Sequence, residues 1–141
     1  MKSVQAHGRV LIDTGAFAAG AIRREINHGR AVAILNMLMA TARPLLTTNL
    51  VVAETHALVL ARAGRALALQ TLHQIDWSVD VLRVTDEDEL TGRAILARYT
   101  DKDFSLADAI SFAVMDRLGI RDTFTFDRHF AQYGFNILQP S

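Results

Sequence analysis

The sequence contains no cysteine and only two prolines among its 141 residues. The absence of cysteine excludes disulfides, thiolate catalysis and zinc sites built from thiolates. No segment combines a charged start with a long apolar run, so the sequence predicts neither a signal peptide nor a membrane span. These absences suit a reducing cytoplasm, and we expect a cytoplasmic protein with no membrane partner.

The chain also lacks net charge, because 15 Lys and Arg residues balance 15 Asp and Glu residues. A neutral chain gives no support to non-specific nucleic-acid binding, which depends on many contacts between cations and phosphates. Any role in nucleic-acid binding must therefore rest on a local positive patch. No glycine-rich phosphate loop and no internal repeat is present either.

Half of the residues are hydrophobic and 21% are charged, which is typical of a globular protein. Strand-like and helix-like patterns alternate along the chain, and this order favours parallel βαβ units. We therefore expect an α/β fold in a single domain over residues 1–141, in which residues 1–8 form a loose leader. Strands are predicted at 10–12, 45–48, 79–84, 123–126 and 136–138, and helices at 14–22, 30–42, 50–63, 65–75, 86–99 and 106–118.

The stretch from Asp101 to Phe130 has the clearest pattern. Ser105 is a suitable N-cap for a helix that Gly119 ends, and a strand of alternating Thr and Phe follows. Asp108 then lies in the first helical turn, and Asp127 lies at the carboxyl end of a strand. Open α/β sheets bind ligands along that edge, so the two acids can meet there. Because S-x-x-D is also a capping pattern, Asp108 has a purely structural explanation as well.

Two further acids occupy unusual positions. Asp13 directly follows the all-apolar strand predicted at 10–12, where a carboxylate needs a partner or a metal unless it simply caps the next helix. Both explanations stay open for Asp13. Glu54 falls on the predicted inward stripe of the helix at 50–63, although structural glutamates usually face solvent. This placement favours a functional role for Glu54. The predicted stripe consists of Leu50, Glu54, Ala57, Leu58 and Ala61.

The acids at these four positions offer only oxygen ligands, which suit hard cations such as Mg²⁺ and Mn²⁺. Such ions can activate water and stabilise charge on a phosphodiester. The five histidines show no spacing typical of a zinc site. The residues alone therefore support a divalent-metal site.

The chain resembles the PIN-domain family, and within it the VapC group of toxin ribonucleases. The stretches that match span nearly the whole chain in the family's order. They are LIDTGAF, TTNLVVAETHALV, SLADAISFAVMDRLGI and TFTFDRHF. The last two are the most specific, whereas DTGA alone would be weak.

The resemblance implies a doubly wound, three-layer α/β/α fold with a central parallel sheet. Position by position, Asp13 and Asp108 match the acids most directly tied to Mg²⁺, and Glu54 and Asp127 match the other two acids of the cluster. All four are expected to serve as metal ligands and catalytic residues, with Mg²⁺ or Mn²⁺ as cofactor. The expected function is a divalent-metal-dependent endoribonuclease, the toxin of a type II toxin–antitoxin pair, with RNA as substrate and a homodimeric state.

Substrate and partner contacts are also expected. A phosphodiester needs positive charge near the acids, and the loop after the first helix contains arginines where family members often have Asp or His. The candidates for RNA binding are Arg23, Arg24, Arg30, Arg128 and His129. The apolar stripes of the helices at 30–42 and 50–63 are expected to leave a groove between them for a segment of the antitoxin.

Two other classes of protein compete with this interpretation. Phosphatases with an aspartate nucleophile also place an acid after the first strand, but they need a second Asp where this chain has Gly15. A non-catalytic PIN-like module that binds RNA or serves as a scaffold would not need all four acids. An assay of metal-dependent RNA cleavage separates this alternative from the nuclease.

Overall fold

The computed structural model describes residues 8–140 and places five parallel strands in one sheet. Residues 1–7 of the leader expected at 1–8 lie outside the described residues. The strand order is β3-β2-β1-β4-β5, so the chain first builds outward from β1 on one side and then on the other. The strands are β1 (Val10–Ile12), β2 (Leu45–Thr48), β3 (Asp80–Leu82), β4 (Asp122–Phe124) and β5 (Asn136–Ile137).

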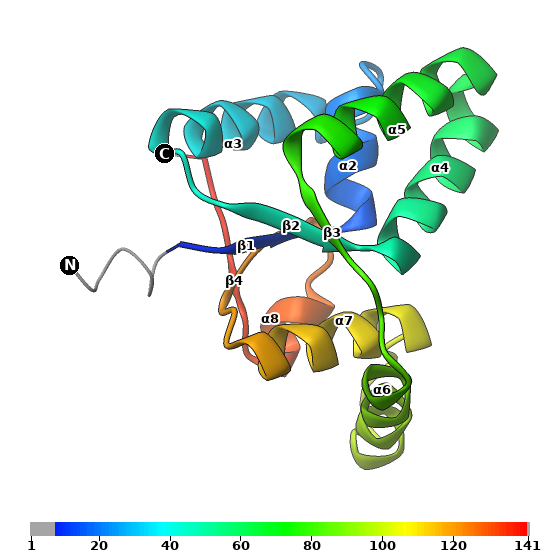
Figure 1. Ribbon diagram of the computed structural model, residues 1–141, viewed down its shortest axis with the longest axis vertical. Coiled ribbons are helices and arrows are strands. Elements are labelled where there is room, and N and C mark those ends of the chain that lie inside the picture. Colours follow the sequence, from blue (N-terminus) through cyan, green and yellow to red (C-terminus); the bar gives the residue numbers. More distant parts are fainter. Residues whose placement is uncertain (1–7, 141) are drawn as a thin grey trace.

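Seven helices within the described residues cover the two faces of this sheet. α2, α3, α4 and α5 lie on one side, and α6, α7 and α8 lie on the other (Figure 1). The expected α/β class with three layers is therefore confirmed. The helices are α2 (Thr14–Ala21), α3 (His28–Thr41), α4 (Asn49–Ala63), α5 (Arg65–Ser78), α6 (Asp86–Arg98), α7 (Leu106–Leu118) and α8 (His129–Tyr133).

Each face of the sheet has its own hydrophobic core. Val10, Ile12 and Phe124 pack under α2 and α3, while Leu11 points the other way and packs with Phe112 of α7. All three residues of β1 are fully buried, because both faces of this central strand are covered. α7 is buried over the seven consecutive residues 109–115, since it lies between the sheet and α6.

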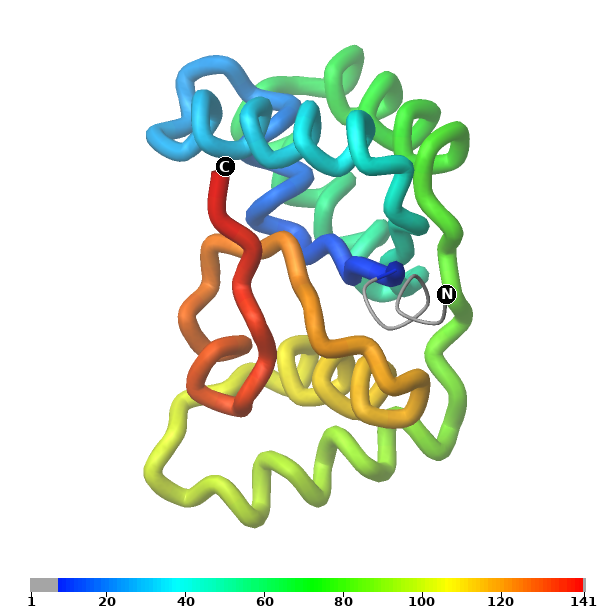
Figure 2. The backbone as a smooth tube through the Cα atoms, turned by 90° about the vertical axis from the view of Figure 1, so that its left-hand side faces the viewer, coloured from blue at the N-terminus to red at the C-terminus, as the bar shows by residue number. Residues whose placement is uncertain are grey.

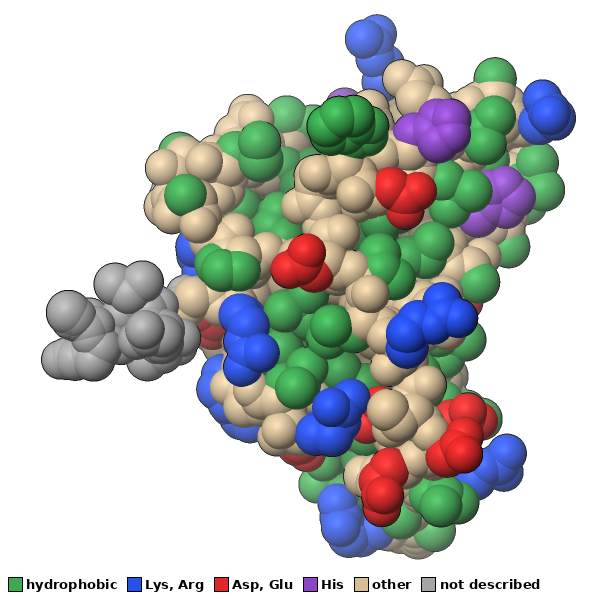
Figure 3. Space-filling view, in the orientation of Figure 1, with side chains coloured by type: hydrophobic (Ala, Val, Ile, Leu, Met, Phe, Trp, Pro, Cys, Tyr) green, Lys and Arg blue, Asp and Glu red, His purple; other side chains and the backbone are tan. Residues whose placement is uncertain are grey.

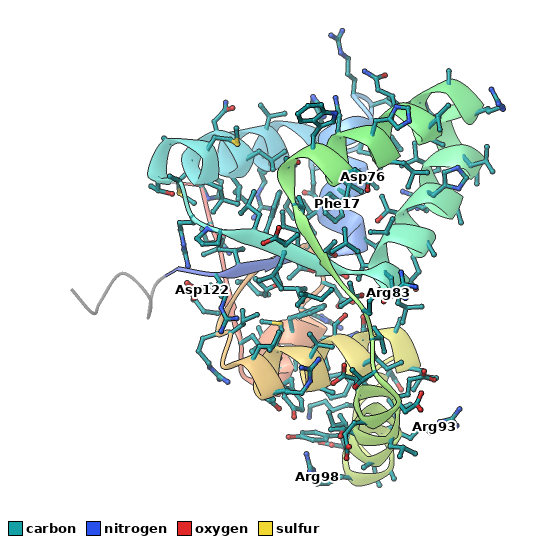
Figure 4. All side chains as sticks on the ribbon, in the orientation of Figure 1. Phe17, Asp76, Arg83, Arg93, Arg98 and Asp122 are labelled. Carbon is teal, nitrogen blue, oxygen red and sulfur yellow. The ribbon has the colours of Figure 1, made fainter. Side chains whose placement is uncertain are left out.

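Side chains define the starts of the helices on the α6–α7 side. Thr85 and Asp88 form a capping box at α6, as do Ser105 and Asp108 at α7, so both predicted caps are confirmed. Asp88 is buried and receives two hydrogen bonds of 2.8 Å from Arg117. This contact lowers the pKa of Asp88 and joins α6 to α7. Acidic side chains gather over α6, while Arg93 and Arg98 project outward from it (Figures 3 and 4).

The predicted inward stripe of α4 is wrong by one residue. The buried residues of α4 are Val51, Thr55 and Val59, and Glu54 is exposed. Thr55 is tolerated inside because its hydroxyl donates a hydrogen bond of 2.8 Å to the Val51 carbonyl oxygen. A rule that searches for apolar residues alone therefore selects the neighbouring stripe.

The predicted cap and groove of α4 also need correction. Thr48, not Asn49, caps α4, and the Asn49 side chain instead accepts a hydrogen bond of 2.8 Å from the Val84 amide. α2 packs against both α3 and α4, so these two helices do not form a groove between them. Residues 125–126 were predicted to extend β4, but they leave the sheet after Phe124. No helix in residues 8–140 is long and apolar enough to cross a membrane.

Candidate active site

The sheet has a topological switch point between β1 and β4, from which the chain builds the sheet in opposite directions. Asp13 follows β1 directly, and its amide donates a hydrogen bond of 3.1 Å to the Phe124 carbonyl oxygen at the end of β4. Asp127 comes shortly after β4 on the same edge. A crevice outside the carboxyl ends of the strands at such a point is where open α/β sheets bind ligands.

The other two acids reach this edge from helices. Glu54 lies in α4, which follows β2, and Asp108 lies in the first turn of α7, which leads into β4. An open cleft of about 700 Å³ is lined by all four of the predicted acids. The structure thus places all four acids along one cleft, two in the loops after β1 and β4 and two in α4 and α7, while their roles as ligands stay predictions. The cleft residues are Asp13, Thr14, Gly15, Glu54, Asp108, Phe126, Asp127, Arg128 and His129.

Thr125 connects the two acids that follow the strands. Its buried hydroxyl donates a hydrogen bond of 2.9 Å to Asp13 Oδ2 and accepts one of 2.9 Å from the Asp127 amide. The sequence pattern assigned Thr125 to the interior of a strand, so this residue was missed. Its position two residues before Asp127 was the available signal, because Ser and Thr hydroxyls commonly bond to nearby backbone groups.

His129 lies between two carboxylates. Its Nδ1 atom is 3.2 Å from Asp108 Oδ2 and 3.2 Å from Asp127 Oδ1. The edge of its ring also meets Phe104, with the ring centroids 5.5 Å apart. One potential ligand atom from each of Asp108, Asp127 and His129 lies within 4.8 Å of the others. His129 was predicted only as an RNA contact, but it is placed to orient these acids as well.

The electrostatics of the cleft favour protonation or a bound cation. Burial raises the pKa of Asp13 to about 6, and the charges of Asp108 and Asp127 add to this effect. The hydrogen bond from Thr125 opposes it. Burial, followed by the charge of Asp127, also raises the pKa of Asp108. A cation in the cleft would stabilise the charged forms of these carboxylates.

The capping explanations for Asp13 and Asp108 have different outcomes. Asp13 occupies the N-cap position of α2 but makes no capping hydrogen bond through its side chain. Asp108 does complete a capping box, although the bond from the Ser105 amide to Asp108 Oδ2 is long, at 3.4 Å. The same Oδ2 atom faces His129. Capping therefore does not account for Asp13 and accounts only in part for Asp108.

Glu54 stands at the exposed rim of the cleft. Its Oε1 atom accepts a hydrogen bond of 3.2 Å from Thr14 Oγ1, which ties α4 to the start of α2. Carboxylates at these positions supply the oxygen ligands that divalent cations prefer, and the open cleft leaves room for water. The acidic cluster thus fits a divalent cation.

The predicted cationic contacts fall into two groups. Arg128 and His129 line the cleft, and Arg30 lies in a recess beside it. Arg23 and Arg24 do not line the cleft, and the Arg24 guanidinium donates to the carbonyl oxygen of Arg62. RNA binding by Arg23 and Arg24 stays a prediction.

The chain thus combines a doubly wound α/β/α fold with an acidic cleft at the switch point. A protein family with both features can be compared with it directly. The family model for the PIN domain matches residues 10–136, so the chain belongs to the PIN-domain family. It is also a homologue of the VapC20 toxin ribonuclease. The 23S rRNA-specific endonuclease VapC20 of Mycobacterium tuberculosis is 32% identical over 133 residues, which cover 93% of this chain and 98% of VapC20.

Solved structures agree with this assignment. The crystal structure of Mycobacterium tuberculosis VapC20, described as a sarcin-ricin loop cleaving toxin, matches with a TM-score of 0.83 and 32% identity. It covers 93% of this chain and 99% of the VapC20 chain. The structure of VapBC2 from Rickettsia felis bound to a DNA fragment from their promoter has a TM-score of 0.71 at 12% identity, covering 93% of this chain and 97% of that one. That second likeness shows the fold alone.

Proposed function

We propose that the chain is a divalent-metal-dependent endoribonuclease that hydrolyses phosphodiester bonds of RNA. The main support is the convergence of Asp13, Glu54, Asp108 and Asp127 into one cleft at the switch point of the sheet. Mg²⁺ is the proposed cofactor, with Mn²⁺ as an alternative, because both prefer oxygen ligands and tolerate retained water. Membership of the PIN-domain family and the likeness to VapC20 support the same conclusion.

Each residue has a separate task in this proposal. Asp13 and Asp108 would hold the cation, and Asp127 and Glu54 would complete the set around it. Thr125 would keep Asp13 oriented, and Glu54 is itself held by Thr14. When bound, the cation would supply charge stabilisation at the scissile phosphate and a more acidic water.

The proposed substrate is ribosomal RNA. VapC20 is described as specific for 23S rRNA, and its crystal structure as that of a sarcin-ricin loop cleaving toxin. The 32% identity extends over 93% of this chain, so a substrate of the same class is the natural first candidate. Such a substrate would place the protein in the cytoplasm, and we propose that residues 1–141 act there as one unit.

We further propose a VapB-type antitoxin as partner and a homodimer as the active form. The 32% identity to VapC20 and the resemblance to the VapC group of toxins support this pairing. The most suitable surface is an apolar recess of about 130 Å³ between α2, α3 and α5, with Phe17, Leu35 and Met39 in its lining. A small DNA-binding protein encoded beside this chain should co-purify with it. Sedimentation of the purified protein would test the dimer.

A cleavage assay tests the proposed activity. Purified protein is incubated with ribosomal RNA in Mg²⁺, in Mn²⁺ or with EDTA, and the products are mapped. The wild type should cut only with a divalent cation, and Asp13→Asn and Asp108→Asn should lose at least about a hundredfold in rate, the scale of losing one electrostatic contact to the transition state. Asp76→Asn is the matched control, because Asp76 is an exposed acid on α5 (Figure 4).

The same assay also tests the alternative, a PIN-like module that binds RNA or acts as a scaffold without cleaving. Wild-type protein that binds RNA but gives no product with either cation would favour the non-catalytic module. Cleavage that survives in both Asn variants would show that the acidic cleft is not the catalytic site.

A further inference from the structure

A second recess of about 200 Å³ opens beside the acidic cleft. Phe126 and Arg128, in the loop after β4, line both the cleft and this recess. The opposite wall comes from the start of α3, with Asn27 and Arg30, and from the C-terminal segment, which ends beside α3 (Figure 2). Three segments that are distant in sequence therefore form one small site next to the acids.

The recess has the opposite electrostatic character to the cleft. Two arginines line it and no carboxylate does. The Arg30 guanidinium lies 5.5 Å from the centroid of the Phe126 ring, and it donates a hydrogen bond of 3.3 Å to Gln139 Oε1. The guanidinium of the exposed Arg128 makes no hydrogen bond or ion pair within residues 8–140. The recess is therefore locally basic, although the net charge of the chain is zero.

An aromatic ring next to arginines suits one nucleotide of a single strand. Bases stack on aromatic rings or guanidinium planes, and arginine binds phosphate in a fixed geometry. The amides of Asn27 and Gln139 add donors and acceptors for a base edge. With this lining, the recess suits a ligand that carries both an anionic group and a planar ring. An acidic side chain suits it less well, because it offers only the anionic group.

We infer that this recess binds the nucleotide adjoining the scissile phosphate, with its base on Phe126 and its phosphate between Arg30 and Arg128. The inference rests on the proposed function, because it places the scissile phosphate at the four acids. Phe126 and Arg128 line both sites, so an RNA strand that runs from the cleft into the recess passes these two residues. Asn27 and Gln139 then give the enzyme a preference for the base at this one position.

The binding test uses Asp13→Asn protein, so that RNA is not consumed, and a short RNA with 2-aminopurine beside the mapped cleavage position. Fluorescence of 2-aminopurine should fall on binding, because stacking quenches it. Adding Phe126→Leu should abolish the quenching and raise the Kd about tenfold, the scale of one lost base–aromatic stack. Arg30→Gln should raise the Kd and reduce the slope of log Kd against log salt by about one.

Arg93→Gln is the matched control, because Arg93 is an exposed arginine that projects from α6 (Figure 4). Phe126 packs near Phe124, with the ring centroids 5.9 Å apart, so melting curves must show that Phe126→Leu is folded. Arg30 is exposed, so Arg30→Gln removes no buried side chain and tests the recess even if Phe126→Leu unfolds. In otherwise wild-type protein, both changes should raise KM and leave kcat within about threefold, because bound RNA still reaches intact acids.

The outcomes separate this inference from the proposed function. If the wild type cleaves RNA while Phe126→Leu and Arg30→Gln match Arg93→Gln in Kd and KM, the recess is not a nucleotide site and the nuclease assignment stands. If both variants bind RNA normally but bind the antitoxin weakly, the recess is a protein contact and the inference is wrong. If the wild type neither binds nor cleaves RNA, both proposals fail together.

Discussion

Asp13 is the residue whose surroundings most clearly distinguish function from capping. Burial and two neighbouring carboxylates raise its pKa to about 6, so the metal-free protein holds its charged form at a cost. Asp13 also lacks the capping hydrogen bond that a structural role would require. A residue that destabilises the metal-free protein is expected at a functional site, because folding alone would not favour it.

The pH dependence of stability gives a first prediction. The pKa of Asp13 is higher in the folded than in the unfolded state, so between about pH 4 and pH 6 the folded protein binds the extra proton. The contribution of Asp13 to stability in EDTA should therefore fall as pH rises through this window, by about 3 kcal/mol. Asp13→Asn should be more stable than wild type at pH 7 and show a weaker dependence. Urea unfolding from pH 4 to pH 7 measures both, and an Asn variant that is less stable at pH 7 would contradict the assignment.

Thr125 gives a second prediction at the same scale. Thr125→Val keeps the shape but removes the hydrogen bonds to Asp13 and to the Asp127 amide, so it should cost about 1–3 kcal/mol. It should also reduce the rise in Tm that Mn²⁺ produces, since Asp13 loses its orientation.

Thr123→Val is the matched control for this change. Thr123 is equally buried, and its hydroxyl donates to the Leu11 carbonyl oxygen at 2.9 Å, away from the acids. It should lower Tm without changing the effect of Mn²⁺. Equal metal responses in the two Val variants would show that Thr125 has no positioning role.

At the scale of the helix and strand, local signals predicted the starts of helices well. The capping patterns at Thr85 and Ser105 are both formed, and Gly119 ends α7 in the left-handed region with φ of 68°. These features depend only on neighbours within one turn, so the sequence suffices. The inward face of α4 depends on packing against α2 and α5, and its central buried residue is Thr55. Periodicity of apolar residues does not detect a buried threonine.

Gly92 tests the packing between α6 and α7. A Cβ at this position would lie 2.9 Å from Ile110 Cγ1 and 3.2 Å from the Ile110 amide nitrogen. Because backbone as well as side chain is in the way, Gly92→Ala should destabilise the protein by about 1–3 kcal/mol. Gly29→Ala in α3 is the control, since no atom lies within 4 Å of its added Cβ, and it should be neutral or slightly stabilising. Thermal unfolding compares the two, and equal stabilities would show that the helices do not need this close approach.

At the scale of the whole molecule, the alternation of strands and helices was enough to predict the α/β class. The order of the strands was not predictable from periodicity. β1 pairs with β4 across more than a hundred residues, and this pairing is what brings Asp13 beside Thr125 and Asp127. The positions of the acids supported a divalent-metal site, and the family resemblance assigned all four acids to one cluster. Neither source predicted the orientation of His129 toward Asp108.

The charge distribution of the molecule follows from the same topology. The loop after β4 separates an acidic cleft from a basic recess, and both lie at the edge where the strands end. Asp122, at the start of β4, lies at the opposite edge of the sheet (Figure 4). It forms an ion pair with Arg43 there. A chain of zero net charge can therefore present a cation site and a phosphate site side by side.

The central claim is that four carboxylates form one divalent-metal site, and a calorimetric titration with Mn²⁺ tests it most directly. Wild type and Asp76→Asn should bind Mn²⁺ with the same affinity. Asp13→Asn, Glu54→Gln, Asp108→Asn and Asp127→Asn should each bind at least about tenfold more weakly, because each loses a charge that faces the same cation. Wild-type protein that binds no Mn²⁺, or binding that all four variants retain unchanged, would contradict the account.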